Sequence, residues 1–315
     1  MTLNNPIPFD KSYLDSIRIN RSAVELRAQT LGTRRTFKVE AQAASLLRVI
    51  QCMDLTTLAG DDTPGKVHRL CAKALQPVQR DTLERLDLEN YDVRVGAVCV
   101  YHELIAPAKE ILRGRIPIAA VSTGFPAGQT PLELKIKEIE YSIHAGAEEI
   151  DIVISRSLAL TNQWEKLYEE IKILREACTV KMKTILGVGN LGTLETIAKA
   201  SAVAIMAGSD FIKTSTGFEP TNATLESGLV MVREIRKHFH ATNEESRIGF
   251  KPAGGIRTAK DAMLWMTLMI EELGEAWTHP QLFRIGASGL LTDIERQLHH
   301  LATGRYSAAH HHAMS

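Results

Sequence analysis

Residues 208–217 read GSDFIKTSTG, and the prediction of the fold starts from this stretch. A Gly-Ser-Asp turn signal precedes Phe211 and Ile212, which are residue types that suit a β-strand. Lys213 then stands where an apolar strand would continue. A buried lysine loses its proton more easily, because desolvation disfavours the ammonium, and it becomes an amine nucleophile near neutral pH. The alternative is a lysine at a strand end that reaches solvent through its methylene stem.

The rest of the chain repeats this pattern of a strand followed by a helix. Eight apolar stretches each precede a segment with helical spacing: Val49–Leu58, Val93–Tyr101, Ile116–Phe125, Glu149–Ser155, Val180–Gly187, Phe211–Gly217, Ile248–Gly255 and Phe283–Ser288. The helical segments that follow include residues 131–145, 161–177, 193–207, 222–240 and 258–273. Eight alternating units predict a single (β/α)8 TIM barrel of the α/β class, with parallel strands and right-handed crossovers. The pattern alone leaves a doubly wound sheet open.

The sequence predicts three regions along the chain. Residues 1–50 form an N-terminal helical extension, with helices expected over 12–32 and 37–50. Residues 51–303 form the barrel, because no linker rich in Pro, Gly or Ser divides them. Residues 304–315 are small and polar and are expected to be a mobile tail. We interpret the three adjacent histidines in this tail as solvated, because one short tract offers a metal no fixed geometry.

The composition excludes several classes of protein. Lys+Arg and Asp+Glu both number 37 in 315 residues, so no global field attracts nucleic acid or an anionic membrane. The four cysteines (Cys52, Cys71, Cys99 and Cys178) lie far apart without a CxxC pair, which disfavours a zinc ribbon or a disulfide framework. The polar N-terminus does not resemble a signal peptide, and no run of 18 apolar residues occurs. We therefore expect a cytoplasmic enzyme without membrane or nucleic-acid partners.

Five charged residues interrupt apolar strands at positions where a barrel carries function. Functional residues of this fold lie at the carboxyl ends of strands and in the loops that follow. The five are Asp54, Asp151, Lys183, Lys213 and Lys251, from strands one, four, five, six and seven. Their convergence suits amine catalysis on a carbonyl compound, in which a second lysine depresses the pKa of the first and a carboxylate moves protons. The alternative is a purely stabilising cluster of lysines and aspartates.

Two glycine-rich segments follow strands seven and eight. They read KPAGGIR at 251–257 and RIGASG at 284–289. Their backbone N–H groups, with Arg257 and the N-termini of the following helices, predict a phosphate site at the usual place in this fold. The alternative is that these glycines only make tight turns.

A third glycine-rich segment argues for a different function. Residues 187–192 read GVGNLG and match the GxGxxG pattern of a dinucleotide-binding fold. Four strands precede the segment, however, and Asp210 lies in a turn rather than at a strand end. We therefore disfavour nicotinamide binding, because the motif alone is weak.

Seven stretches of this chain resemble the deoxyribose-phosphate aldolase family of class I, metal-independent aldolases. They are residues 53–58, 97–101, 124–128, 149–153, 210–217, 251–257 and 283–288, in order. The FIKTSTG and KPAGGIR segments carry the resemblance most specifically. The N-terminal helical extension is similar to that of the longer family members.

The resemblance implies reversible cleavage of 2-deoxy-D-ribose 5-phosphate to D-glyceraldehyde 3-phosphate and acetaldehyde, a lyase reaction of deoxyribonucleotide catabolism. It assigns Lys213 as the Schiff-base lysine, Lys251 as the lysine that lowers its pKa, and Asp151 as the proton-shuttling carboxylate. It implies no metal and no cofactor, and it leaves a homo-oligomer open. The expected substrate-binding residues are Asp54, Cys99, Lys183, Thr216, Gly217, Gly254, Gly255, Arg257, Gly286 and Ser288.

The chain departs from the family at two places. Phe218 stands where some members carry a lysine, which removes one cationic phosphate contact. Family members often end in a tyrosine that enters the site, whereas nine residues follow Tyr306 here. Two rival functions stay open: another Schiff-base barrel enzyme such as a transaldolase or a different sugar-phosphate aldolase, and a catalytically silent sugar-phosphate-binding barrel.

Overall fold

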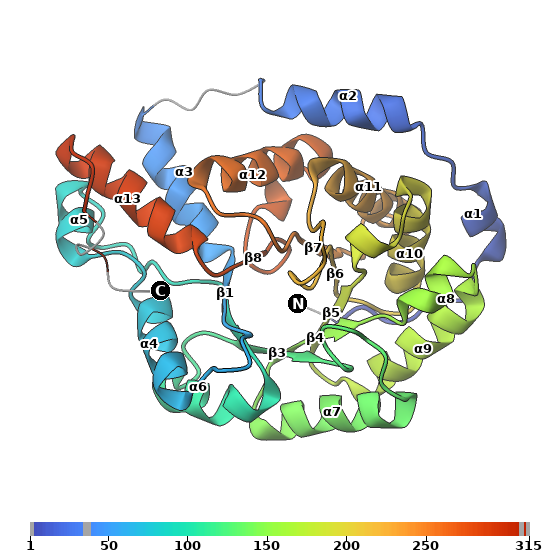
Figure 1. Cartoon of the computed structure of the whole chain (residues 1–315). Coiled ribbons are helices and arrows are strands. Elements are labelled where there is room, and N and C mark those ends of the chain that lie inside the picture. Colours follow the sequence, from blue (N-terminus) through green and yellow to red (C-terminus); the bar gives the residue numbers. More distant parts are fainter. Residues whose placement is uncertain (1–2, 34–38, 309–311, 313–315) are drawn as a thin grey trace.

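Eight parallel strands form the barrel that the sequence predicts (Figure 1). A computed structural model describes residues 3–33, 39–308 and 312. The strand order is β7-β6-β5-β4-β3-β2-β1-β8, and bridges from Phe250 to Phe283 and from Ala253 to Gly286 join the two ends of the sheet. The strands are β1 (Met53–Thr56), β2 (Ala97–Val100), β3 (Ile118–Ser122), β4 (Glu149–Val153), β5 (Lys181–Ile185), β6 (Phe211–Lys213), β7 (Gly249–Lys251) and β8 (Ile285–Ala287).

Helices follow the strands and surround the barrel (Figure 1). Thr193, Thr224 and Thr258 each begin a helix by accepting a hydrogen bond from a backbone N–H of its first turn. The α-helices from β1 onward are α4 (Pro64–Leu75), α5 (Arg80–Arg85), α6 (Ile105–Leu112), α7 (Leu132–Ala145), α8 (Arg156–Leu160), α9 (Trp164–Ala177), α10 (Leu194–Met206), α11 (Leu225–Ala241), α12 (Ala259–Leu273) and α13 (Leu290–Thr303). Short 3-10 turns lie at His102–Leu104, Val188–Asn190 and Glu275–Trp277.

The N-terminal extension contains more helices than the sequence predicted. The single helix expected over 12–32 is wrong, because α1 (Lys11–Ser16) and α2 (Arg21–Leu31) are separate. The side chain of Asn20 accepts a hydrogen bond from the Ala23 N–H and so begins a new helix. A third helix, α3 (Val39–Gln51), leads into β1, and the predicted helix start at 37 lies outside the described residues.

The extension lies against the outside of the barrel, and Figure 1 shows α2 beside α11 and α12. The Tyr13 hydroxyl donates to Glu234 of α11 at 2.5 Å, and Arg27 forms ion pairs with Glu271 and Glu272 of α12. The Asn4 N–H donates to Asp210, directly before β6. These contacts attach the extension to the helices of the second half of the barrel.

The strands contribute two kinds of side chain to the barrel interior. Strands β2 and β3 contribute small apolar residues, which form one buried cluster: Ala97, Cys99, Ala119 and Val121. Strands β1 and β4–β7 contribute buried aspartates, a glutamate and lysines. The small residues on one side leave room for the long lysine side chains from the other.

The end of the chain lies beside α13 where it is described. Gly304 ends the helix with φ +71, a left-handed conformation that glycine adopts without strain. The Tyr306 ring stacks on His300 of α13, with ring centroids 4.4 Å apart, rather than entering the barrel. Ser307 and His312 are buried and hydrogen-bonded to each other. The mobility expected for 304–315 stays a prediction, and residues 309–311 and 313–315 lie outside the described part.

None of the described helices combines the length and the hydrophobicity that crossing a membrane requires.

Candidate active site

The five charged strand residues singled out from the sequence meet in the barrel interior. Their side chains come from β1, β4, β5, β6 and β7. Each is at most 3% exposed: Asp54, Asp151, Lys183, Lys213 and Lys251. Charges at this depth require partners, because the interior stabilises an isolated ion far less well than water does.

Asp151 is the centre of this cluster. The Lys213 ammonium lies 2.7 Å from Asp151 Oδ2, and the Lys251 ammonium lies 2.8 Å from the same oxygen. Lys183 donates to the other carboxylate oxygen at 2.9 Å. Lys251 also contacts Asp54. One carboxylate therefore orients three lysines, and two of them share one of its oxygens.

The register of the sheet produces this arrangement. Lys213 on β6 lies directly opposite Lys251 on β7, and Asp151 on β4 lies opposite Lys183 on β5. Side chains at paired positions of neighbouring strands point to the same face of a sheet. Two lysines that are 38 residues apart in the sequence therefore become neighbours.

The three lysines differ in how readily they lose a proton. Burial lowers the pKa of Lys213, and the nearby Lys251 ammonium lowers it further, against the opposing effect of Asp151. Burial also disfavours the charged form of Lys251, but Asp151 and Asp54 raise its pKa overall. The pKa of Lys183 is likewise raised by its carboxylate neighbours against the effect of burial. Lys213 is thus the lysine of the three that is suited to act as a neutral amine.

Asp151 stays ionised in this setting. Burial alone would raise its pKa, but the ammonium groups of Lys183, Lys213 and Lys251 together hold the pKa well below its ordinary value. Cys99, on β2 beside the same charges, has a pKa raised by burial, so it stands in the interior as a neutral thiol.

A cavity of about 730 Å³ opens over the carboxyl ends of the strands. Of the five charged residues, only Lys213 lines it. Its other lining residues come from the carboxyl ends of β1 and β8, from the loops after β1, β6, β7 and β8, and from α4, and they include Thr216, Gly217, Gly254, Gly255, Arg257, Gly286 and Ser288. Lys213 therefore faces a space that a small molecule can enter, while Lys251 and Asp151 lie behind it.

The loops around this cavity offer backbone donors to an anion. Gly254 and Gly255 have φ angles of +83 and +84, which are favourable only for glycine. For the described residues, the structure records no hydrogen bond from either of these two N–H groups to another protein atom. Ser288 lies two residues before α13, whose N-terminus favours negative charge. These groups form a concave surface with polar donors at one end of the cavity.

Three backbone N–H groups of the expected substrate-binding residues already have partners within the protein. The Gly217 and Thr216 N–H groups both donate to the carboxylate of Glu219, at about 3 Å. The Gly286 N–H donates to the Pro252 carbonyl at 2.9 Å. Glycine at 217 and 286 therefore shapes the loops, and Gly254, Gly255 and Ser288 are the better donors for an anion.

Phenylalanine side chains lie on one side of the cavity, beside Lys213. The Lys213 ammonium lies 6.0 Å from the centre of the Phe125 ring. Phe218 packs edge-to-face against Phe125, with ring centroids 5.8 Å apart, and remains 59% exposed. The side chain at 218 thus extends an apolar wall beside Lys213.

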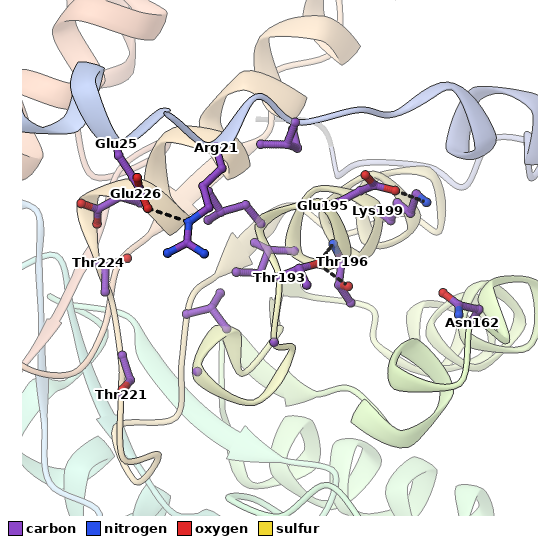
Figure 2. Close-up of a pocket in the computed structure, with 16 residues that line it drawn as sticks. Arg21, Glu25, Asn162, Thr193, Glu195, Thr196, Lys199, Thr221, Thr224 and Glu226 are labelled. Atoms are coloured by element: carbon purple, nitrogen blue, oxygen red, sulfur yellow. Dashed lines mark hydrogen bonds and ion pairs between the residues drawn. The ribbon is translucent and has the colours of Figure 1, made fainter. Parts of the chain in front are cut away.

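A second cavity, of about 850 Å³, lies between α2 and the start of α10 (Figure 2). Arg21 and Glu25 of α2 form a hydrogen-bonded ion pair on one side, and Thr193, Thr196 and Glu195 lie on the other. None of the five charged strand residues lines this cavity. Val188, Gly189 and Gly192 of the GVGNLG segment also line it, and this segment precedes a helix that begins with its own threonine cap.

Comparison with known proteins identifies the family. A sequence model described as "DeoC/LacD family aldolase" matches residues 48–290. The chain belongs to the DeoC/LacD family of aldolases. It is 51% identical over 316 residues to the protein named "Deoxyribose-phosphate aldolase" of Homo sapiens, covering 99% of each chain. It is also 51% identical over 310 residues to that of Mus musculus, covering 97% of each.

A solved structure supports the fold of this DeoC/LacD family member. The chain matches the crystal structure of a putative deoxyribose-phosphate aldolase from Toxoplasma gondii with a TM-score of 0.71 at 20% identity. The match covers 84% of this chain and 97% of that one. Similarity at this level supports the barrel fold.

Four residues of the site were not found from the sequence. Lys66 of α4 lines the cavity and forms an ion pair with Asp62 at 2.6 Å. Glu219 holds the loop after β6 through the contacts described above. Glu149 and Arg284 lie among the buried charges toward the amino ends of the strands. The position of Lys66 shortly after β1 was a usable signal, because loops after barrel strands carry function.

Proposed function

We propose that this protein cleaves 2-deoxy-D-ribose 5-phosphate to D-glyceraldehyde 3-phosphate and acetaldehyde, and catalyses the reverse condensation, through an imine on Lys213. The observation that carries the proposal is the position of Lys213. It is the member of the five-residue cluster that lines the cavity, it has a lowered pKa, and Asp151 lies 2.7 Å from its nitrogen. The family and the names of its relatives supply the substrate.

The reaction begins with the neutral amine. The Lys213 nitrogen adds to the C1 aldehyde of the open-chain sugar, and loss of water from the protonated carbinolamine gives the protonated imine, which accepts the electron pair in the next step. A base removes the proton of the C3 hydroxyl, and the bond between C2 and C3 breaks. Its electron pair forms the enamine and D-glyceraldehyde 3-phosphate leaves. Protonation of C2 and hydrolysis of the imine release acetaldehyde and restore the amine.

Asp151 is positioned to move the protons. Its carboxylate touches the nitrogen of Lys213 and is ionised because of its three lysine partners. A water between Asp151 and the substrate would carry protons to and from the carbinolamine and the C3 hydroxyl. Lys251 has a raised pKa and is turned toward two carboxylates, so it serves as the fixed ammonium that favours the neutral form of Lys213.

The phosphate of the substrate would bind at the far end of the same cavity. The N–H groups of Gly254, Gly255 and Ser288 face it, with Arg257 and Lys66 as cations on its wall. Phe218 adds no charge here, so backbone donors carry a larger part of the binding. The remaining expected residues (Asp54, Lys183 and Cys99) lie behind Lys213 and shape its surroundings rather than contact the phosphate.

Trapping of the imine tests the proposal. The protein is incubated with 2-deoxy-D-ribose 5-phosphate, reduced with borohydride, digested and examined by peptide mass analysis. We expect an ethyl group or the reduced sugar on the peptide that contains Lys213, and release of acetaldehyde in the unreduced reaction. Lys213→Met should abolish both, while Lys135→Met, which removes a buried lysine outside the barrel interior, should abolish neither.

The same experiment separates the rivals. A silent binding protein would bind the sugar phosphate and give no reducible adduct. A transaldolase or a different sugar-phosphate aldolase would form an adduct with a ketose donor in preference to acetaldehyde. An adduct found only at another lysine would contradict the role of Lys213. The cytoplasmic location and a homo-oligomeric state stay predictions.

A further inference from the structure

The buried charges of the barrel interior do not balance. Toward the amino ends of the strands, Glu149 and Arg284 join the five charged residues of the site. All seven are at most 3% exposed. They comprise four basic residues (Lys183, Lys213, Lys251 and Arg284) and three acidic ones (Asp54, Glu149 and Asp151). If every group were ionised, one buried positive charge would lack a counterion, which is costly in the interior.

The contacts indicate which basic group gives up its proton. Arg284 keeps its charge at all relevant pH values and contacts Asp54 and Glu149. Lys251 contacts two carboxylates, and Lys183 contacts three. Among the described residues, Lys213 has a single carboxylate partner, which it shares with both other lysines. The surplus proton is therefore least stable on Lys213.

Arg284 is built into the base of the barrel, directly before β8. Its guanidinium donates to Asp54 Oδ1 at 2.5 Å and to Glu149 Oε1 at 2.8 Å, and its Nε donates to the Pro280 carbonyl. Gly96 packs against it: a Cβ there would lie 2.7 Å from the Gln51 carbonyl oxygen and 3.2 Å from Arg284 Cδ. The other oxygen of Asp54 contacts Lys251. The carboxylate of Asp54 therefore links Arg284, at the amino ends of the strands, to Lys251, which lies behind the cavity.

We propose that Arg284 and Glu149 are positioning residues for the amine chemistry at Lys213: together they set the charge balance that leaves this lysine without its proton. Arg284 satisfies Asp54 and Glu149 with a permanent charge, so neither carboxylate is available to neutralise the lysines fully. The negative charge of Glu149 partly offsets the positive charges of Arg284 and Lys183, and so limits how readily Lys213 loses its proton. The inference rests on the proposed imine chemistry and adds two residues that do not touch the substrate.

The surroundings of both ends support this assignment. The titratable and charged groups that face Lys213 are Asp151, Lys251 and Cys99, and the pKa of that thiol is raised. Those around Arg284 are Asp54, Glu149 and the thiol of Cys52, whose pKa burial raises to about 12. Lys183 and Lys181 reach the base through Glu149, and Arg48 lies near Cys52. Both thiols are therefore neutral near neutral pH, and neither adds a negative charge to the seven buried charged residues.

The test uses two variants with opposite expected signs. Arg284→Met removes a buried positive charge, so Lys213 should hold its proton to higher pH. Glu149→Gln removes a negative charge, so Lys213 should lose its proton at lower pH. The readout is the rate of reductive trapping at Lys213 with acetaldehyde, measured from pH 5 to 10 on full-length protein, because it follows the amine itself. We expect the acid limb to move up by roughly one pH unit in the first variant and down by a similar amount in the second.

Three controls separate charge balance from a merely structural role. Arg284→Lys retains the positive charge and should return the profile toward that of the unmodified protein. The double variant Arg284→Met/Glu149→Gln removes one charge of each sign, so the two shifts should largely cancel. Lys135→Met removes a buried lysine that bonds Ser155 and Glu170 outside the barrel interior, and it should leave the profile unmoved.

The outcomes decide the inference either way. Shifts of the same sign in the two single variants, no shift in the folded Glu149→Gln variant, or a shift in the folded double variant as large as that of a single variant would overturn it, and the last two tests hold even if Arg284→Met did not fold. Circular dichroism and thermal melting report folding for each variant. If the unmodified protein formed no adduct at Lys213, the proposed function itself would fail. An adduct at Lys213 with profiles that do not depend on the charge at 149 and 284 would overturn this inference alone.

Discussion

The barrel interior has two ends: the cavity end, at the carboxyl ends of the strands, where Lys213 lies, and the base, at the amino ends, where Arg284 lies. Both ends contain buried charged groups, but their basic side chains differ in how readily they lose a proton. At the cavity end, Lys213 has one carboxylate partner and a lowered pKa. At the base, Arg284 has two carboxylate partners and a raised pKa, because Glu149 and Asp54 outweigh the effect of burial. Both residues are 3% exposed. Burial is therefore equal at the two ends, and the number of partners makes the difference.

This comparison explains how one barrel can hold both a stable ion cluster and a reactive amine. A buried cation with two carboxylates is fixed in its charged form, which suits a structural role. A buried cation that shares a single carboxylate with two other cations is close to losing its proton. The predictions below disturb one end or the other and compare the results.

Asp151→Asn should have the largest effect. It removes the carboxylate that orients three lysines and that we propose moves protons, so turnover should fall by roughly 10²–10⁴-fold while the fold is kept. The measurement is kcat for cleavage of 2-deoxy-D-ribose 5-phosphate. Asp210→Asn is the matched control, because Asp210 is a buried carboxylate that pairs with Arg175 outside the cavity. A loss below about tenfold in Asp151→Asn would remove this residue from the mechanism.

Lys251→Leu should change the pH dependence of the reaction. The adjacent ammonium lowers the pKa of Lys213, so its removal raises that pKa and moves the acid limb of the kcat/KM profile to higher pH. We expect a shift of roughly one unit or more, with slow residual adduct formation at high pH. The shift should exceed that of Arg284→Met, since Lys251 shares Asp151 Oδ2 with Lys213 directly. A profile that does not move would contradict the proposed role of Lys251.

Gly255→Val tests whether the backbone N–H groups of the loop that contains Gly255 bind the phosphate. A side chain at this open position would enter the cavity and displace a phosphate from the N–H groups of the loop. We expect KM for 2-deoxy-D-ribose 5-phosphate to rise by roughly tenfold or more, since a charged hydrogen bond contributes about 1.5–3 kcal/mol. KM for unphosphorylated deoxyribose should change little.

The control for this variant is Gly192→Val. Gly192 also has a positive φ angle and open space around it, but it lies at the second cavity. It therefore carries the same backbone strain without blocking the phosphate. If both sugars suffered equally in Gly255→Val, the phosphate would bind elsewhere.

The sequence predicted the cavity end better than the base. Every strand was found, because eight apolar stretches alternate with helical segments, and a charge inside such a stretch is conspicuous. Asp151 and Lys213 were found in this way. Glu149 and Arg284 were missed because the rule that function lies at carboxyl ends of strands directs attention away from amino ends. A usable signal existed, since Glu149 lies two residues before Asp151 and therefore points to the same face of the strand.

Other features depend on contacts that no sequence pattern specifies. The carboxylate of Glu219 accepts hydrogen bonds from the N–H groups of Thr216 and Gly217, two residues that the resemblance placed among the substrate-binding residues. The break between α1 and α2 depends on the cap at Asn20, within a stretch whose apolar spacing suggested one helix. Glycines indicate where the backbone turns, but only the folded loop decides where its N–H groups donate.

Lys181→Met should have the smallest effect. It tests whether the burial of a charge or its distance from Glu149 determines its influence on Lys213. Lys181 lies 3.2 Å from Glu149, so it touches the same carboxylate as Arg284, but its side chain is 20% exposed. Water and salt screen an exposed charge, so its removal should move the acid limb of Lys213 trapping by less than about 0.3 pH units at physiological salt. Repeating the measurement at about 10 mM ionic strength, where the screening length is roughly 30 Å, should enlarge the shift. The shift of Arg284→Met should change little with salt, because that charge is buried. If Lys181→Met moved the profile as far as Arg284→Met at both salt concentrations, proximity to Glu149 rather than burial would govern the effect of the base on Lys213.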